Sequence, residues 1–305
     1  MPLGLAQSAQ VQALLDKVAG LDQSGGNPRL KQIVRRVVGD AFGALDEFDV
    51  SPEEFWQALA FFQQGAGEFG LIAPGLGFDR YLDILMDARE AAAGKGGGTP
   101  RTIEGPLYVA GAPVSEGFAR LDDGTDRDAG PLIMAGTVRD AGGEPVSGAV
   151  VEVWHADSTG SYSFFNASLA PYNLRRTIKT GADGTYKFRT SMPSGYAVPP
   201  GGYAERLCAA VGRHGQRPAH IHFFVSAPGH QHLTTQINIA GDPFLYEDFA
   251  FATRDELIPE TTLCDDAGMI AAEGLDEPFT KIEFDFTLVA GHDALMARPR
   301  FEAAA

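Results

Sequence analysis

Cysteine is scarce in this sequence, which has only Cys208 and Cys264 among 305 residues. Two cysteines cannot build a disulfide framework, and their wide spacing argues against a thiolate metal site. Long apolar runs are also missing, because none approaches the roughly 18 residues that a membrane-spanning helix needs. Residues 1–15 contain no basic residue and no continuous apolar core, so they do not read as a secretory signal. We therefore expect a cytoplasmic protein that is not a membrane protein.

Positive charge is the other deficit. Lys and Arg total 24 against 40 Asp and Glu, which gives a formal net charge of -16. Such a balance repels nucleic-acid phosphates and anionic lipid headgroups, so we expect no nucleic-acid partner and favour a small neutral substrate. The hydrophobic fraction of 44% and the charged fraction of 21% are typical of a globular protein, and the length allows two domains.

The first part of the chain has helical periodicity. Apolar residues recur at helical spacing from about residue 7 to residue 93. Within it, Ser51 predicts a helix N-cap, followed by Pro52 at the first helical position and Glu54 to complete a capping box, in a helix that runs to about Phe61. The glycine-rich segment 94–100 cannot continue a helix. We predict a helical N-terminal domain over residues 1–100.

Beyond residue 100 the pattern changes to short β-branched or alternating runs separated by turn residues, which favours a β-sandwich over residues 101–305. The predicted fold class is therefore mainly β, with an α-helical N-terminal domain. The strands are expected at residues 132–138, 149–154, 185–189, 219–225, 234–239 and 281–288.

The segment His220-Ile221-His222 is the most informative stretch of the chain. Alternate residues of a strand point to the same side, so the two imidazoles start about 6.6 Å apart along the backbone and can reach one metal ion. Two strand histidines that only hydrogen-bond to neighbours are the structural alternative. Histidines are concentrated here, since five of the seven lie between residues 214 and 232.

Two tyrosines upstream could complete a metal site. Tyr162 and Tyr196 each stand in a segment rich in glycine, serine or proline, although most tyrosines of a protein are ordinary core aromatics. Two phenolate oxygens with two imidazole nitrogens suit a hard trivalent ion better than zinc or calcium. Ferric iron is the natural candidate.

The second part of the chain contains several ordered motifs. They are Trp154-His155-Ala156, Asn173-Leu174-Arg175-Arg176, Pro193-Ser194-Gly195-Tyr196, the segment from Gly212 to His222, and the segment from Pro228 to Gln236. Together they resemble the intradiol ring-cleaving dioxygenases, and within them the branch that acts on catechol. The resemblance covers nearly the whole chain, and it departs from the expected pattern chiefly at Asp157 and Asn166.

The resemblance implies specific residue roles. It implies one Fe(III) per chain, held by Tyr162, Tyr196, His220 and His222, with Tyr196 and His222 in axial positions. It places Tyr196, Arg217 and Gln236 among the catalytic residues. The implied substrate-binding residues are Leu71, Pro74, Ile103, Gly105, Pro106, Leu107, Arg217, Phe249 and Ala250.

The resemblance also implies an activity and partners. It implies cleavage of catechol with O2 to cis,cis-muconate in the β-ketoadipate pathway, by iron that activates the organic substrate. The helical front end resembles a linker domain that forms homodimers and encloses a phospholipid at the dimer interface. The alternatives are a hydroxyquinol or chlorocatechol 1,2-dioxygenase and, in a different class, a transthyretin-like binding module.

Overall fold

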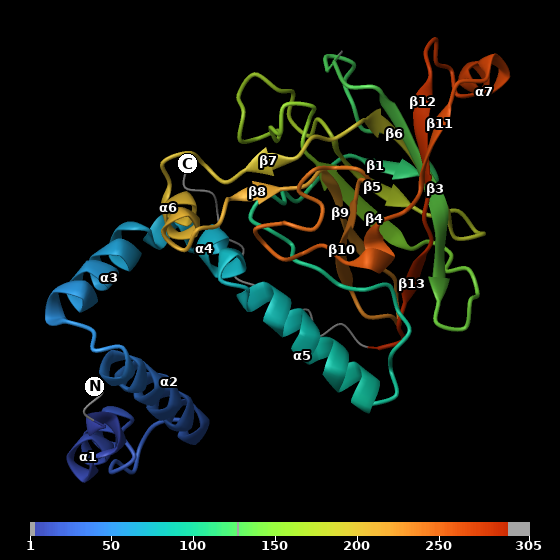
Figure 1. Cartoon of the computed structure of the whole chain (residues 1–305). Helices are drawn as coiled ribbons and strands as arrows, with labels where there is room; N and C mark the ends of the chain where they lie inside the picture. Colours follow the sequence, from blue (N-terminus) through green and yellow to red (C-terminus); the bar gives the residue numbers. More distant parts are fainter. Residues whose placement is uncertain (1–3, 127, 292–305) are drawn as a thin grey trace. The chain divides into compact units, whose positions relative to one another are not determined.

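The computed structural model describes residues 4–126 and 128–291 (Figure 1). His292 and the remainder of the predicted second domain up to residue 305 lie outside the described residues. The chain divides into two compact units, Met1–Ala66 and Gly67–Ala305. Each unit is described by itself below.

Unit 1 is helical, as the periodicity predicted. Its helices are η1 (Leu5–Gln7), α1 (Ala9–Val18), α2 (Pro28–Glu47) and α3 (Pro52–Gln64). The predicted start of α3 is confirmed: Ser51 accepts a hydrogen bond from the Glu54 N–H, and the Glu54 carboxylate accepts the Ser51 N–H in return. The helix continues to Gln64, three residues beyond the predicted end.

Helices α2 and α3 bury none of their residues. Several of their large apolar side chains are instead exposed, among them Val37 at 62% and Trp56 at 64%. An amphipathic helix gains stability mainly by burying its apolar face, so these faces are suited to contact with another surface.

Unit 2 begins with further helices and continues as a β-sandwich. Its helical elements are η2 (Ala66–Glu68, which spans the division), α4 (Phe69–Gly75), α5 (Phe78–Ala92), α6 (Tyr203–Ala210), η3 (Asp255–Leu257) and α7 (Ala267–Ala272). Helix α5 ends two residues before the glycine-rich segment, where the sequence predicted the change from helix to strand. The compact units divide at residue 66, which is a different division from the domain boundary predicted at residue 100. That boundary stays a prediction.

Two sheets form the sandwich (Figure 1). The first has the order β1 (Val114–Glu116), β5 (Arg175–Lys179), β4 (Val150–His155), β9 (His220–Ser226), β10 (Leu233–Asn238). The second has the order β11 (Thr261–Cys264), β12 (Phe279–Glu283), β3 (Pro131–Asp140), β6 (Thr185–Ser191), β2 (Phe118–Arg120), and β13 (Phe286–Leu288) also pairs with β3. A separate ladder joins β7 (Tyr196–Ala197) to β8 (Gln216–Arg217).

The main core lies between the two sheets. Strand β9 contributes Ile221, Phe223 and Val225, all fully buried, and strands β3 and β6 contribute Met134 and Phe188 from the opposite sheet. Because strand side chains alternate, the other residues of β9 point away from this core. His220 and His222 are thereby placed on the outer face of the five-stranded sheet.

One predicted strand is two. The run 281–288 breaks into β12 and β13, because the Phe284 N–H donates to the Ala135 carbonyl and the Asp285 carboxylate accepts the Thr137 N–H. This crossing needs a glycine at position 136, where an added Cβ would lie 1.7 Å from the Phe284 carbonyl oxygen. The close backbone approach, which apolar alternation does not encode, explains the missed break.

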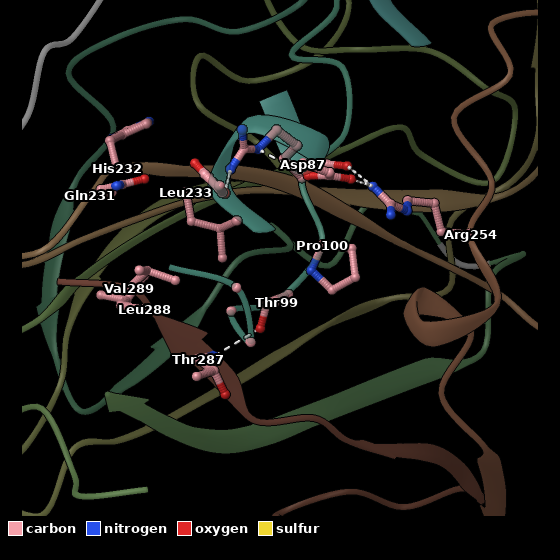
Figure 2. A pocket seen from close by; sticks show the side chains of 15 residues that line it. Asp87, Thr99, Pro100, Gln231, His232, Leu233, Arg254, Thr287, Leu288 and Val289 are labelled. Atoms are coloured by element: carbon pink, nitrogen blue, oxygen red, sulfur yellow. Dashed lines mark hydrogen bonds and ion pairs between the residues drawn. The ribbon is translucent and has the colours of Figure 1, made fainter. Parts of the chain in front are cut away.

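Helix α5 is tied to the sandwich by a cluster of ion pairs beside a pocket of about 180 Å³ (Figure 2). The Arg254 Nη1 atom lies 2.9 Å from an Asp87 oxygen, and Arg101 pairs with Glu90. The pocket lies between α5, the segment 96–101 and the ends of β10 and β13, and its lining contains none of the predicted site residues. Within the described residues, no helix is long and apolar enough to cross a membrane.

Candidate functional site

Four predicted metal ligands come together on the outer face of the five-stranded sheet. His220 and His222 stand on β9, which is held between β4 and β10. Tyr196 stands on β7, where its backbone pairs with Arg217 of β8. Tyr162 lies in the connection between β4 and β5. Residues distant in the sequence therefore meet at one point.

The donor atoms of these four side chains lie in a continuous chain of short contacts. The two Nε2 atoms of His220 and His222 are 3.0 Å apart, the His220 Nε2 lies 3.5 Å from the Tyr196 hydroxyl oxygen, and the hydroxyl oxygens of Tyr196 and Tyr162 are 3.4 Å apart. Donor atoms about 2.0–2.1 Å from a shared ion lie roughly 3 Å from one another. The spacing therefore fits one metal ion.

The tautomer of His220 supports the same interpretation. Its Nδ1 lies 2.6 Å from the Pro218 carbonyl oxygen, which can only accept, so Nδ1 carries the proton. The Nε2 atom then presents its lone pair toward His222 and the tyrosines, as a metal-ligating histidine requires. In the part of the chain that the structure describes, no group of three or more His, Cys, Asp or Glu could hold a metal. A metal at this place would therefore use the phenol oxygens as well.

Burial sets the charge of these donors. It lowers the pKa of His220 to about 3, with a further contribution from the positive charge of Arg217, and it lowers the pKa of His222 well below its ordinary value. Both imidazoles are thus neutral near pH 7. Burial and the neighbouring Tyr196 raise the pKa of Tyr162 well above 10, so this phenol ionises only if a cation compensates the charge.

Two aromatic and cationic contacts at the site were not predicted. The indole of Trp154 stacks on the His222 ring, with centroids 5.0 Å apart and planes 8° from parallel. The guanidinium of Arg175 lies 5.7 Å from the centroid of the Tyr162 ring and donates to Ser163. Both residues stand in motifs that carried the family resemblance. The position of Trp154 follows from cross-strand register, because it lies opposite His222 of β9 and Arg175 of β5.

Arg217 and Gln236, both predicted site residues, lie beside the donor atoms. The Arg217 Nη1 is 3.0 Å from the His220 Nε2, and its Nη2 donates to the Gln236 side chain at 2.7 Å. Asp248, which the sequence analysis missed, forms a buried ion pair with Arg217. A buried charge is usually paired with an opposite charge, but the sequence does not reveal which acidic residue pairs with Arg217.

The predicted substrate-binding residues fall into separate places. Leu71, Phe249 and Ala250 pack in one apolar cluster with Ile72, and Pro74 is buried in helix α4. Leu107 packs against the Trp154, Tyr162 and Tyr196 cluster, and a Cβ at Gly105 would lie 3.9 Å from the His222 ring. Ile103 is buried, whereas Pro106 is exposed.

Two family models match this chain. The family model described as "Dioxygenase" matches residues 103–290, and the model described as "Catechol dioxygenase N terminus" matches residues 27–94. The chain belongs to the intradiol dioxygenase family. It is therefore an enzyme of that family, and membership decides against the transthyretin-like binding module.

Full-length relatives are similar throughout. The catechol 1,2-dioxygenase of Pseudomonas sp. (strain EST1001) is 50% identical, with 98% of this chain and 100% of that protein covered. The crystal structure of catechol 1,2-dioxygenase from Pseudomonas arvilla C-1 has a TM-score of 0.89 at 48% identity and covers 97% of this chain and 98% of that one. The hydroxyquinol 1,2-dioxygenase of Rhizobium sp. (strain MTP-10005) is 31% identical, over 86% of this chain and 90% of that protein.

Titration of His155, which is buried in the sandwich, should make the stability of the fold depend on pH. Its Nδ1 donates to the Ala156 carbonyl and its Nε2 accepts from the Thr190 hydroxyl, both at 2.7 Å, and burial lowers its pKa to about 4. Between pH 6.5 and 4 the unfolded chain binds a proton here that the folded chain does not. Stability should therefore fall as the pH drops through this window.

We expect His155→Gln to make the stability less sensitive to pH. The wild-type free energy of unfolding should decline more steeply from pH 6.5 to pH 5 than that of the variant, by at most about 1.4 kcal/mol per pH unit. Urea unfolding at several pH values measures both slopes. Equal slopes would contradict a neutral buried His155.

Proposed function

We propose that this chain is a catechol 1,2-dioxygenase that cleaves the ring between its two hydroxyl-bearing carbons. It combines catechol with O2 to give cis,cis-muconate, with both oxygen atoms incorporated, as a step of aromatic-compound breakdown in the β-ketoadipate pathway. The convergence of two phenol oxygens and two imidazole nitrogens, in a chain of this family, carries the proposal.

A ferric ion held by Tyr162, Tyr196, His220 and His222, one per chain, is part of the proposal. The donor set suits it, because two anionic phenolates and one hydroxide would balance a charge of three and so reduce the cost of burial. When bound, such an ion acts as a Lewis acid that draws electron density from a chelated diol and prepares the ring for attack by O2.

The two tyrosines differ in exposure, which supports different roles. Tyr162 is only 4% exposed, whereas Tyr196 is half-buried on the short ladder between β7 and β8. We propose that the Tyr196 oxygen accepts a proton from the arriving diol, while Tyr162 remains a permanent ligand. Tyr196 and His222 would both be ligands of the ion in the same proposal.

Arg217 and Gln236 would orient the ring, and the apolar residues would keep water away from it. Arg217 is buried and points its Nη1 at the donor cluster, so it supplies a fixed positive charge and hydrogen-bond donor without reorganisation. We propose that Leu71, Pro74, Ile103, Gly105, Pro106, Leu107, Phe249 and Ala250 form the substrate wall. An apolar wall with a few polar groups is typical of sites for small aromatic ligands.

Oxygen consumption with a panel of diols tests the function. Iron-loaded protein should consume O2 with catechol and form a product with the absorbance of cis,cis-muconate, at a higher kcat/KM than with hydroxyquinol or chlorocatechols. The greater identity to catechol-cleaving relatives favours this order. A higher kcat/KM with hydroxyquinol or a chlorocatechol would establish one of the alternatives instead.

Substitution of each tyrosine separates the two proposed roles. We expect Tyr196→Phe to retain iron but lose about 10²–10⁴-fold in kcat, the usual contribution of a positioned proton acceptor. Tyr162→Phe should lose both turnover and iron, because a permanent anionic ligand is removed. Metal analysis and visible absorbance of the purified variants measure both effects. Full iron content and full turnover in Tyr162→Phe would contradict the ligand assignment.

We propose that the enzyme forms a cytoplasmic homodimer through its N-terminal helices. The exposed apolar faces of α2 and α3 support a second copy as the occupant, with a phospholipid enclosed at the interface, and the two buried free cysteines suit a reducing compartment. Native mass spectrometry should give twice the 32.4 kDa chain mass. Organic extraction of the same sample should release the lipid, and a monomeric mass would contradict the proposal.

A further inference from the structure

Arg217 is held in a single plane by two side chains. Its Nε donates to one oxygen of Asp248 and its Nη2 to the other, both at 3.1 Å. This paired arrangement matches the planar fork of a guanidinium and fixes its orientation. With Nη2 also bonded to Gln236, the remaining Nη1 is directed at the His220 Nε2. The direction of Nη1 is thus set largely by Asp248.

The pair is almost completely removed from solvent. The Arg217 side chain is 5% exposed and the Asp248 side chain 1%. Burial alone would raise the pKa of Asp248, but the charge of Arg217 and its hydrogen bonds lower it below the ordinary value, so the carboxylate is ionised. The two opposite charges cancel beside the donor cluster. Asp248 therefore determines the net charge there as well as the geometry.

Asp248 is also bonded to the segment that contains two predicted substrate-wall residues. Its two oxygens accept the N–H groups of Ala250 and Ala252, at 3.1 and 3.3 Å. Phe249 lies between Asp248 and Ala250 in the sequence, and its carbonyl accepts from Arg213 at 2.9 Å. One carboxylate therefore connects the guanidinium to the Phe249–Ala250 wall.

We propose that Asp248 is a positioning residue for diol cleavage, which aims Arg217 at the donor cluster, cancels its charge and fixes its distance from the substrate wall. The proposal rests on the proposed function. The Asp248 carboxylate accepts hydrogen bonds from Arg217 and from the backbone of Ala250 and Ala252. It therefore acts through Arg217 rather than on the substrate.

A loop-fixing aspartate nearby provides a matched control. Asp242 accepts the N–H of Ala219 at 2.9 Å and that of Phe244 at 2.8 Å. It therefore fixes backbone segments in the way that Asp248 does, but neither bond involves a guanidinium. Loss of backbone fixation alone should affect both aspartates, whereas loss of arginine positioning should affect Asp248 only.

The experiment compares Asp248→Asn, Arg217→Gln, the double variant and Asp242→Asn in the iron-loaded full-length enzyme. Asn keeps the shape of Asp248 but removes its charge. We expect Asp248→Asn to keep its iron and to lose about 10–100-fold in kcat, as is usual for residues that orient the groups around a metal. Asp242→Asn should keep kcat near the wild-type value.

The double variant distinguishes positioning from packing. If Asp248 acts through Arg217, Asp248→Asn should cause no further loss of kcat once Arg217→Gln is present. A second measurement does not depend on activity. Arg217→Gln leaves a buried carboxylate without its cation, so the double variant, which has neither charge, should have a higher Tm than Arg217→Gln alone.

Three results would overturn the proposal. They are equal loss of kcat in Asp248→Asn and Asp242→Asn, a further loss from Asp248→Asn in the Arg217→Gln background, and a Tm of the double variant below that of Arg217→Gln. Failure of the proposed function would give a different result. Wild-type protein with stoichiometric iron would then not cleave catechol, whatever the variants do.

Discussion

The alternation of side chains along strand β9 is the constraint on which the site depends. Ile221, Phe223 and Val225 fill the space between the two sheets. Because side chains alternate along the strand, His220 and His222 must project from the opposite face of the sheet. A register shift of one residue would bury the imidazoles in the sandwich and expose the core residues. The stability of the fold and the geometry of the histidine pair are therefore enforced by the same packing.

Charge is the second constraint, because Tyr162, His220 and His222 are almost fully buried. Burial keeps both imidazoles neutral, and the cation of Arg217 is matched by Asp248. The Tyr162 phenol ionises there only with a cation as partner. An environment of this kind strengthens every electrostatic interaction within it, so small changes of position or charge have large effects.

Much of the architecture follows from sequence patterns. The Ser51 and Glu54 capping box, the helices up to residue 92 and strands β3, β4, β6, β9 and β10 were predictable from local chemistry and periodicity, although the shorter strands β1, β2, β5 and β11 were missed. The split between β12 and β13 was not, because it depends on a carbonyl contact at Gly136 with a segment far along the chain. Compactness also divides the chain at residue 66, whereas the pattern change lies near residue 100.

The candidate site was partly predictable for similar reasons. The His-x-His pair is a local pattern, and the tyrosines gained meaning only with it and the ordered motifs of the resemblance. Asp248 and the stacking of Trp154 on His222 depend on long-range register and on the burial of Arg217, which no short segment encodes. Residues that support a site are harder to predict than the residues that form it.

The separation of the donors from the apolar wall has an evolutionary consequence. The two histidines belong to a central strand, whereas Leu71 belongs to helix α4 and Phe249 and Ala250 belong to a connecting segment. Connecting segments tolerate mutation better than central strands do. We therefore expect the proposed wall residues to differ between relatives named for catechol, hydroxyquinol and chlorocatechol, while the two strand histidines are kept.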